Sequence, residues 1–298
     1  MIAMFCNQLN NILGVNDMKK VGVIGAGVMG SGVSQNFAQS GYRVVLLDIS
    51  KDILEHSKEE ISNNLRFRTL FNKGSDIEDT EKVMERIAFG TDYEMLKDVD
   101  FVIENATEDW NIKKAIYEKI DRICQIGCIF MVNTSCISVT KIASLTTRPD
   151  KVIGTHFMNP VPMKKAVEVI RGYHTSEETI KTVDELLLTL GKESIVVNDY
   201  PGFVSNRISH LFMNEAAYVV QDQVATPEEV DEIFKKCYGH TMGPLETADL
   251  IGLDTVVNSL AVLYESYQDP KFRCCPLLRK MVEAGLCGRK SGKGFYSY

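Results

Sequence analysis

The segment VGVIGAGVMG, residues 21–30, is an apolar strand pattern that runs directly into a G-x-G-x-x-G turn. Gly25 suits a tight turn, Gly27 has no Cβ to keep a pyrophosphate from the backbone, and Gly30 lets the following helix pack close to its strand. The N–H groups and dipole at the start of that helix would stabilise phosphate charge. A plain strand-turn-helix without a ligand is the competing interpretation. The residues expected at the phosphates are Gly25, Ala26, Gly27, Val28, Met29 and Gly30.

An acidic residue follows this turn at the end of the next apolar run. The next apolar run, residues 44–47, ends at Asp48, 18 residues beyond Gly30. A strand, a glycine turn, a helix pattern and an acid in this order predict a dinucleotide-binding unit. A carboxylate at this position accepts hydrogen bonds from a ribose 2′-hydroxyl and repels a 2′-phosphate, so NAD(H) is favoured over NADP(H). Lys51 is the nearest cation that could weaken the preference.

Composition fits an enzyme of two domains. The chain has 298 residues, of which 45% are hydrophobic, enough for two cores. Its formal net charge of −7 argues against nucleic acid as a partner. No apolar run reaches the length of about 18 residues that would indicate a membrane span. The eight cysteines are irregularly spaced and form no metal-ligand cluster, which indicates reduced thiols in the cytoplasm and no metal site.

Strand-like runs alternate with helical patterns over the first two-thirds of the chain. The runs are residues 21–24, 44–47, 101–104, 129–133, 152–156 and 195–197. This alternation predicts a parallel sheet with helices on both faces, that is, a Rossmann-like α/β domain. The polar section 51–98, interrupted near residues 72–75, predicts helices that project as an antiparallel arm over the cofactor side.

The pattern changes after Pro201 and Gly202, where helical periodicity continues without convincing strands. We therefore expect a dinucleotide-binding domain at residues 18–200 and an all-α domain at residues 201–298. Residues 1–17 lack the features of a signal peptide and are assigned no function.

Several ordered motifs together carry a resemblance that covers nearly the whole chain, from Met18 to Tyr298. They are VIGAGVMGSG at 23–32, NTS at 133–135, HFMNPVP at 156–162, VEVI at 167–170, PGFVSNR at 201–207, MGPL at 242–245 and GRKSGKGFY at 288–296. With these motifs the chain resembles the L-3-hydroxyacyl-CoA dehydrogenases, most closely the short bacterial 3-hydroxybutyryl-CoA dehydrogenases. The resemblance implies NAD-dependent hydride transfer at C3 of a 3-hydroxyacyl thioester, in a homodimer formed through the second domain.

His156 and Glu168 are the expected catalytic pair. His156 ends a strand-like run, where open α/β sheets place their ligands, and imidazole can move the hydroxyl proton near neutral pH. A histidine alone is more often structural. Glu168, twelve residues on, could hold the other ring nitrogen. The resemblance assigns both residues to catalysis.

Ser135 and Asn206 are expected to bind the substrate oxygens. Ser135 follows another strand end, and its alternative role is a helix N-cap, for which Ser138 is better placed. Asn206 lies near the start of the first helix of the second domain, where a surface asparagine is the ordinary interpretation. The resemblance gives both a place in the substrate site and, together with the turn and Asp48, further cofactor contacts at Glu108, Lys113, Asn133, Asn159 and Lys290.

The sequence leaves open which group carries the acyl chain of the substrate. Similar family members present lysines on the first arm helix toward the phosphates of coenzyme A, whereas this chain offers Arg66, Arg68 and Lys73 at shifted spacing. These cations could bind coenzyme A or the acidic helix of an acyl carrier protein, as in polyketide-type biosynthesis. A non-catalytic NAD-binding structural protein is the alternative of another class, and the intact set of site residues argues against it.

Overall fold

The computed structural model describes residues 19–71 and 78–298, without the side chains of residues 68–71. The chain forms two compact units, one that ends at Asp199 and one from Tyr200 to Tyr298. The extension at residues 1–17 and the break near residues 72–75 lie outside the described residues. No described helix combines the length and the apolar character that crossing a membrane requires.

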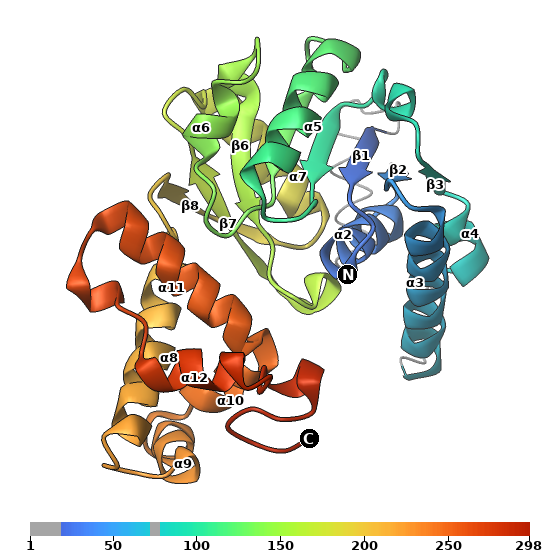
Figure 1. Cartoon of the computed structure of the whole chain (residues 1–298). Coiled ribbons are helices and arrows are strands. Elements are labelled where there is room, and N and C mark those ends of the chain that lie inside the picture. Colours follow the sequence, from blue (N-terminus) through green and yellow to red (C-terminus); the bar gives the residue numbers. More distant parts are fainter. Residues whose placement is uncertain (1–18, 72–77) are drawn as a thin grey trace. The chain divides into compact units, whose positions relative to one another are not determined.

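The first unit is built on one eight-stranded sheet with the order β3-β2-β1-β4-β5-β6-β7-β8 (Figure 1). Its strands are β1 Lys20–Ile24, β2 Arg43–Leu47, β3 Ile87–Gly90, β4 Phe101–Glu104, β5 Ile129–Val132, β6 Val152–His156, β7 Ala166–Arg171 and β8 Glu193–Asn198. The six runs named from the sequence all coincide with strands. The Rossmann-like prediction is therefore confirmed.

The sheet is mostly parallel, as expected, but one of its pairings is not. β6 and β7 pair antiparallel, whereas the other neighbouring strands pair in parallel. The connection of residues 157–165 explains the difference, because a parallel crossover needs about a dozen residues or more. The alternation also missed β3 and β7 as strands. β3 is short and only partly buried, and it lies within the section 51–98 that was expected to be helical.

Helices cover both faces of the sheet (Figure 1). They are α2 Val28–Gln39, α3 Lys51–Phe71, α4 Thr80–Met84, α5 Trp110–Ile123, α6 Val139–Ala143 and α7 Glu177–Thr189. On one face, Phe37 of α2 and Leu187 of α7 share a buried cluster with Met131 of β5. The neighbouring strand residue Phe130 points to the opposite face and packs edge-on against Tyr117 of α5, with ring centroids 6.0 Å apart.

The arm consists mainly of α3, which Figure 1 shows running away from the sheet. Ile61 and Leu65 of α3 are buried in the cluster that covers this face of the sheet. The second arm helix, α4, is short and packs against α2 and α3. The arm thus comprises one long helix, α3, and one short helix, α4.

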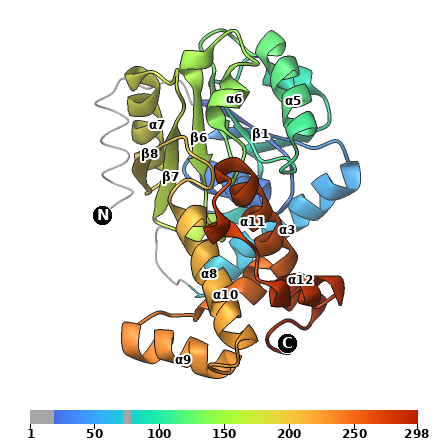
Figure 2. The ribbon, with the colours of Figure 1, turned by 60° about the vertical axis from the view of Figure 1, so that its left-hand side comes forward.

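The second unit is helical, as the periodicity after Gly202 predicted. Its helices are α8 Ser205–Gln221, α9 Pro227–Tyr238, α10 Pro244–Ile251, α11 Leu253–Tyr267 and α12 Pro276–Glu283. Three of them begin with proline, which suits the first helical position because its missing N–H needs no partner there. Met213 of α8, Leu260 of α11 and Leu278 of α12 meet in the core, and Figure 2 shows α8 beside α11.

Two aspartates within this helical unit are fully buried. Asp249 of α10 accepts hydrogen bonds from the backbone N–H groups of Phe295 and Tyr296, each at 3.0 Å. Asp231 of α9 accepts from the backbone N–H of Leu245 at 2.9 Å and from the hydroxyl of Tyr296 at 2.8 Å. The two carboxylates therefore fix the C-terminal segment to the helices.

Candidate active site

The glycine turn connects β1 to α2. Gly25 has φ of +91°, a conformation that strains other residues, and a Cβ on Gly30 would lie 1.7 Å from the carbonyl oxygen of Gly25. Gly27 and Val28, at the start of α2, are exposed. The sequence thus builds an accessible helix N-terminus that can receive an anionic group.

Asp48 lies beside this turn because β1 and β2 pair in parallel, with Ile24 opposite Leu47. Its carboxylate accepts hydrogen bonds from the backbone N–H of Ala26 at 2.8 Å and of Ser50 at 3.1 Å. These bonds fix an acid at the end of the second strand, where dinucleotide sites bind a ribose hydroxyl. The turn, the helix start and Asp48 together fit NAD.

A carboxylate, an imidazole and a hydroxyl from neighbouring strands and the loop after β5 lie in a row. His156 is the last residue of β6, and the antiparallel register places it directly opposite Glu168 of β7. The Nδ1 atom of His156 lies 3.0 Å from Oε2 of Glu168, and its Nε2 atom lies 3.1 Å from Oγ of Ser135. His156 and Glu168 are 7% and 8% exposed. The structure brings together the predicted catalytic pair and Ser135, one of the two residues predicted to bind the substrate oxygens.

This row could move a proton. An ionised carboxylate only accepts hydrogen bonds, so an ionised Glu168 would hold the ring with its proton on Nδ1 and would leave Nε2 as the nitrogen able to gain and lose a proton. The charge of Glu168 also stabilises the imidazolium that forms when Nε2 is protonated. A ligand oxygen beside Nε2 and the hydroxyl of Ser135 could therefore exchange a proton with His156.

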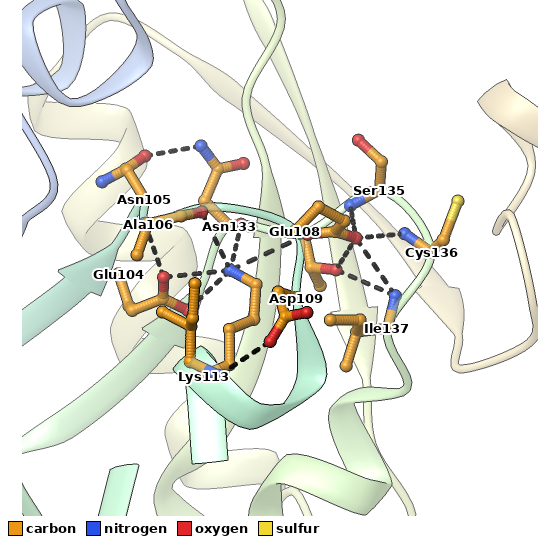
Figure 3. A network of polar contacts seen from close by, with 12 residues as sticks. Glu104, Asn105, Ala106, Glu108, Asp109, Lys113, Asn133, Ser135, Cys136 and Ile137 are labelled. Atoms are coloured by element: carbon orange, nitrogen blue, oxygen red, sulfur yellow. Dashed lines mark hydrogen bonds and ion pairs between the residues drawn. The ribbon is translucent and has the colours of Figure 1, made fainter. Parts of the chain in front are cut away.

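The loop that carries Ser135 is held by a carboxylate from another connection (Figure 3). Glu108 follows β4, and its Oε1 atom accepts hydrogen bonds from the backbone N–H groups of three consecutive loop residues. The donors are Ser135 at 3.0 Å, Cys136 at 2.8 Å and Ile137 at 3.2 Å. The hydroxyl of Thr134 donates to the same oxygen. Glu108, predicted from the sequence as a cofactor contact, contacts the Ser135 loop in this structure.

Lys113, also predicted beside the cofactor, is fully buried against an acid that the sequence analysis missed. Its Nζ atom lies 2.9 and 2.8 Å from the two carboxylate oxygens of Glu104 and 3.3 Å from the carbonyl oxygen of Asn133. Burial raises the pKa of Glu104, and the ammonium of Lys113 opposes that rise. The available signal was the position of Glu104, an acid that ends the apolar run 101–104.

Asn133 ties three strand ends together. Its side-chain Nδ2 donates to Oδ1 of Asn105 at 2.6 Å, and its Oδ1 accepts from the backbone N–H of Phe157 at 3.3 Å. Asn105 follows β4, Asn133 follows β5 and Phe157 follows β6. The amide therefore fixes the spacing of the loops that surround Ser135 and His156.

Asn159 lines an open pocket of about 770 Å³ in the first unit. The wall includes Val28 at the start of α2, Phe67 of the arm helix α3 and Met163 in the turn after β6. Each of these three apolar side chains is more than half exposed. The pocket thus offers apolar surface between the glycine turn and the arm.

The other predicted residues are placed individually. Asn206 is the second residue of α8, and Lys290 is paired with Asp254 at 2.6 Å, both within the second unit. Arg66 is exposed on α3. The side chain of Arg68 and all of Lys73 lie outside the described residues. Within residues 19–71 and 78–298, no group of three or more histidine, cysteine or acidic side chains could hold a metal ion.

Comparison with known families covers both units. The model described as 3-hydroxyacyl-CoA dehydrogenase, NAD binding domain, matches residues 20–200, and that of the C-terminal domain matches residues 202–298. The probable 3-hydroxybutyryl-CoA dehydrogenase of Deinococcus radiodurans is 47% identical over 279 residues, which are 94% of this chain and 100% of that protein.

Two further relatives are also named 3-hydroxybutyryl-CoA dehydrogenases. The 3-hydroxybutyryl-CoA dehydrogenase of Clostridioides difficile is 45% identical over 280 residues, 94% of this chain and 99% of that protein. The crystal structure of (S)-3-hydroxybutyryl-CoA dehydrogenase from Ralstonia eutropha superimposes with a TM-score of 0.90 at 43% identity and covers 95% of this chain and 99% of its own.

Proposed function

We propose that this chain, which belongs to the 3-hydroxyacyl-CoA dehydrogenase family, interconverts (3S)-3-hydroxybutyryl-CoA and acetoacetyl-CoA. Family membership makes it an NAD-dependent oxidoreductase. The choice of a short acyl chain is supported by the similar relatives, which are named 3-hydroxybutyryl-CoA dehydrogenases. The observation that carries the proposal is the row of Glu168, His156 and Ser135 at the strand ends.

His156 moves the proton in the proposed reaction. In the reducing direction, protonated Nε2 gives its proton to the 3-oxygen of the substrate as C3 receives a hydride. In the oxidising direction, Nε2 takes the hydroxyl proton as the hydride leaves C3. Glu168 keeps the ring oriented and stabilises the imidazolium. When bound, NADH would supply the hydride from C4 of its nicotinamide in the reducing direction, and NAD⁺ would accept it there in the oxidising direction.

Two further side chains position the substrate in this proposal. The hydroxyl of Ser135, 3.1 Å from Nε2 of His156, binds the 3-oxygen and so fixes the distance over which the proton moves. Asn206 donates from its amide to the thioester carbonyl or the 3-oxygen. The backbone at residues 25–30, with Asp48, holds the cofactor.

Coenzyme A is the proposed carrier. The similar relatives are named for CoA thioesters, and the apolar pocket beside Val28 and Phe67 suits the apolar parts of such a substrate. Exposed Arg66 on the arm supplies a cation for its phosphates. No observation favours an acyl carrier protein, which is an outcome of the test below. The structural-protein alternative is likewise without support, because the family is one of enzymes.

The remaining proposals concern assembly and compartment. Residues 201–298 form the substrate and dimerisation domain, and residues 18–200 the NAD-binding domain. Exposed apolar side chains on α8 and α11, such as Ile208 and Tyr264, support a homodimer through the second domain. We place the protein in the cytoplasm, because the irregular spacing of its eight cysteines indicates reduced thiols.

The test compares two carriers. NADH oxidation is followed with acetoacetyl-CoA and with the same acyl group on an acyl carrier protein, for the wild type and His156→Ala. We expect rapid turnover of the CoA thioester and a loss of about a thousandfold in kcat for His156→Ala, within the range of general acid–base catalysis. NADPH in place of NADH tests the preference attributed to Asp48.

Each result has one meaning. Turnover confined to the carrier-protein thioester would assign the protein to carrier-bound biosynthesis. Turnover that survives His156→Ala would remove His156 from the mechanism. NADH binding without turnover of either substrate would contradict the proposed reaction.

A further inference from the structure

The loop between β5 and α6 carries Ser135, and a side chain from another connection accepts several of its backbone hydrogen bonds. Three consecutive N–H groups, those of Ser135, Cys136 and Ile137, converge on Oε1 of Glu108. Figure 3 shows the carboxylate inside the curve of this loop. Successive N–H groups that converge in this way form a concave site for an anion. The chain supplies the anion itself.

This arrangement is separate from the capping of α6. That helix begins at Val139, and its N-cap is Ser138, whose side chain accepts from the backbone N–H of Lys141 at 3.2 Å, as the sequence analysis predicted. The donors to Glu108 all precede the cap. Glu108 therefore organises the loop itself, from a position in the sequence 27 residues before Ser135.

A second bond closes the loop around Thr134. Its hydroxyl donates to Oε1 of Glu108 and accepts from the backbone N–H of Ile137 at 2.9 Å. The loop residues on both sides of Ser135 are thus fixed to the same carboxylate. This backbone carries Ser135, whose Oγ atom lies 3.1 Å from Nε2 of His156.

Glu108 is itself held in place by charge. Its Oε2 atom lies 3.8 Å from Nζ of Lys113, and that ammonium is anchored by fully buried Glu104 at the end of β4. The anchored cation also contacts the carbonyl of Asn133 at 3.3 Å, just before the loop. Charges of alternating sign thus run from the core of the sheet to the Ser135 loop.

We propose that Glu108 is a positioning residue for the reaction, which holds the backbone of residues 134–137 so that the Ser135 hydroxyl stays at Nε2 of His156. The inference rests on the proposed function, because it assumes that Ser135 and His156 act on the substrate. It gives Glu108 a role that differs from direct contact with the cofactor, since one carboxylate oxygen is engaged by the loop and the other faces Lys113.

A double-mutant cycle separates the two roles. The variants are Glu108→Ala, Ser135→Ala and their combination, assayed with NADH and acetoacetyl-CoA. A displaced loop should lower kcat of Glu108→Ala by about a hundredfold, the effect of a misplacement near 1 Å. If Glu108 acts through Ser135, adding Glu108→Ala to Ser135→Ala should lower kcat by less than about threefold further. The dissociation constant for NADH should stay unchanged throughout.

Two single variants serve as matched controls. Glu108→Gln keeps an acceptor oxygen for the loop and should retain kcat within about fivefold of the wild type, the difference between a charged and a neutral acceptor. Asp109→Asn removes a charge from the adjacent residue, which caps α5 through Asn111 and Ile112. It should leave kcat unchanged.

Hydrogen exchange of the backbone amides tests the same contact without substrate. In Glu108→Ala the amides of residues 135–137 should exchange at least about tenfold faster, and in Asp109→Asn they should exchange as in the wild type. Unchanged protection in Glu108→Ala would overturn the proposal. So would equal kcat losses in both backgrounds, or a loss expressed as weaker NADH binding. A wild type without activity would count against the proposed function alone, because the exchange measurement still decides the contact.

Discussion

Both units use carboxylates to hold loop backbone, but the consequences differ between them. In the second unit, Asp231 and Asp249 are fully buried, and the partners described for them are backbone N–H groups and tyrosine hydroxyls. In the first unit, Glu168 holds an imidazole, and the side chain of Glu108 remains 38% exposed. A carboxylate closed off with groups that do not titrate near neutral pH contributes stability. The same group beside a histidine is the arrangement from which we propose acid–base chemistry.

The largest expected effect concerns the carboxylate beside the histidine in the first unit, which we call the reactive side. Glu168→Gln replaces an acceptor at Nδ1 of His156 with an amide that can also donate, so the ring can adopt the wrong tautomer and the imidazolium loses its counter-charge. We expect kcat to fall by about a thousandfold, while NADH binding and the urea midpoint change little. Steady-state kinetics, fluorescence titration with NADH and urea denaturation measure the three quantities. A fall below tenfold would contradict the catalytic role proposed for Glu168.

The next effect concerns the stabilising side. Asp249→Ala removes the acceptor for the backbone N–H groups of Phe295 and Tyr296, so we expect a loss of about 3 kcal/mol in the free energy of unfolding. Urea denaturation followed by circular dichroism measures it. Glu232→Ala, which removes an exposed partner of Lys236 on α9, is the control and should leave the midpoint unchanged. Equal midpoints for the two variants would contradict the role given to Asp249.

The reactive side was more readable from the sequence than the stabilising side. The glycine turn and Asp48 are separated by a short, regular stretch, and the β-strand pattern brings them together in any fold of this class. His156 and Glu168 also lie close in sequence. The fold class followed from the same regular alternation, apart from β3 and β7, which it missed as strands, and the antiparallel pairing of β6 with β7.

The contacts that escaped sequence reasoning join distant residues. Asp249 meets Tyr296, and Glu108 meets Ile137, only after several elements have packed. A buried acid leaves no periodic signal, because its partners are backbone N–H groups that every residue carries. The burial of Lys113 was equally hidden, since lysine is ordinarily an exposed residue.

The smallest expected effect sharpens the comparison at high pH. Burial, together with the hydrogen bond to Asp231, raises the pKa of Tyr296 above its ordinary value of 10.0. Above about pH 10 the unfolded chain releases this proton and the folded chain retains it, so the free energy of unfolding declines as pH rises beyond that value. Tyr296→Phe should make the decline shallower.

Urea midpoints between about pH 8 and pH 11 measure this slope. Tyr238→Phe, which changes an exposed tyrosine, is the control and should keep the wild-type slope. A Tyr296→Phe slope identical to that of the wild type would contradict the assignment.

The antiparallel pairing of β6 with β7 has a further consequence for how the chemistry is inherited and assembled. It makes the pair of His156 and Glu168 a contact of short sequence separation, closed by one brief connection. Closing such a short connection costs little loop-closure entropy, so the contact can form early in folding. The two residues are also encoded in one short, uninterrupted stretch of the gene. The contact also depends on the register of β6 and β7 as well as on the identity of the two residues, because a slip of one residue in β7 would turn Glu168 to the other face of the sheet.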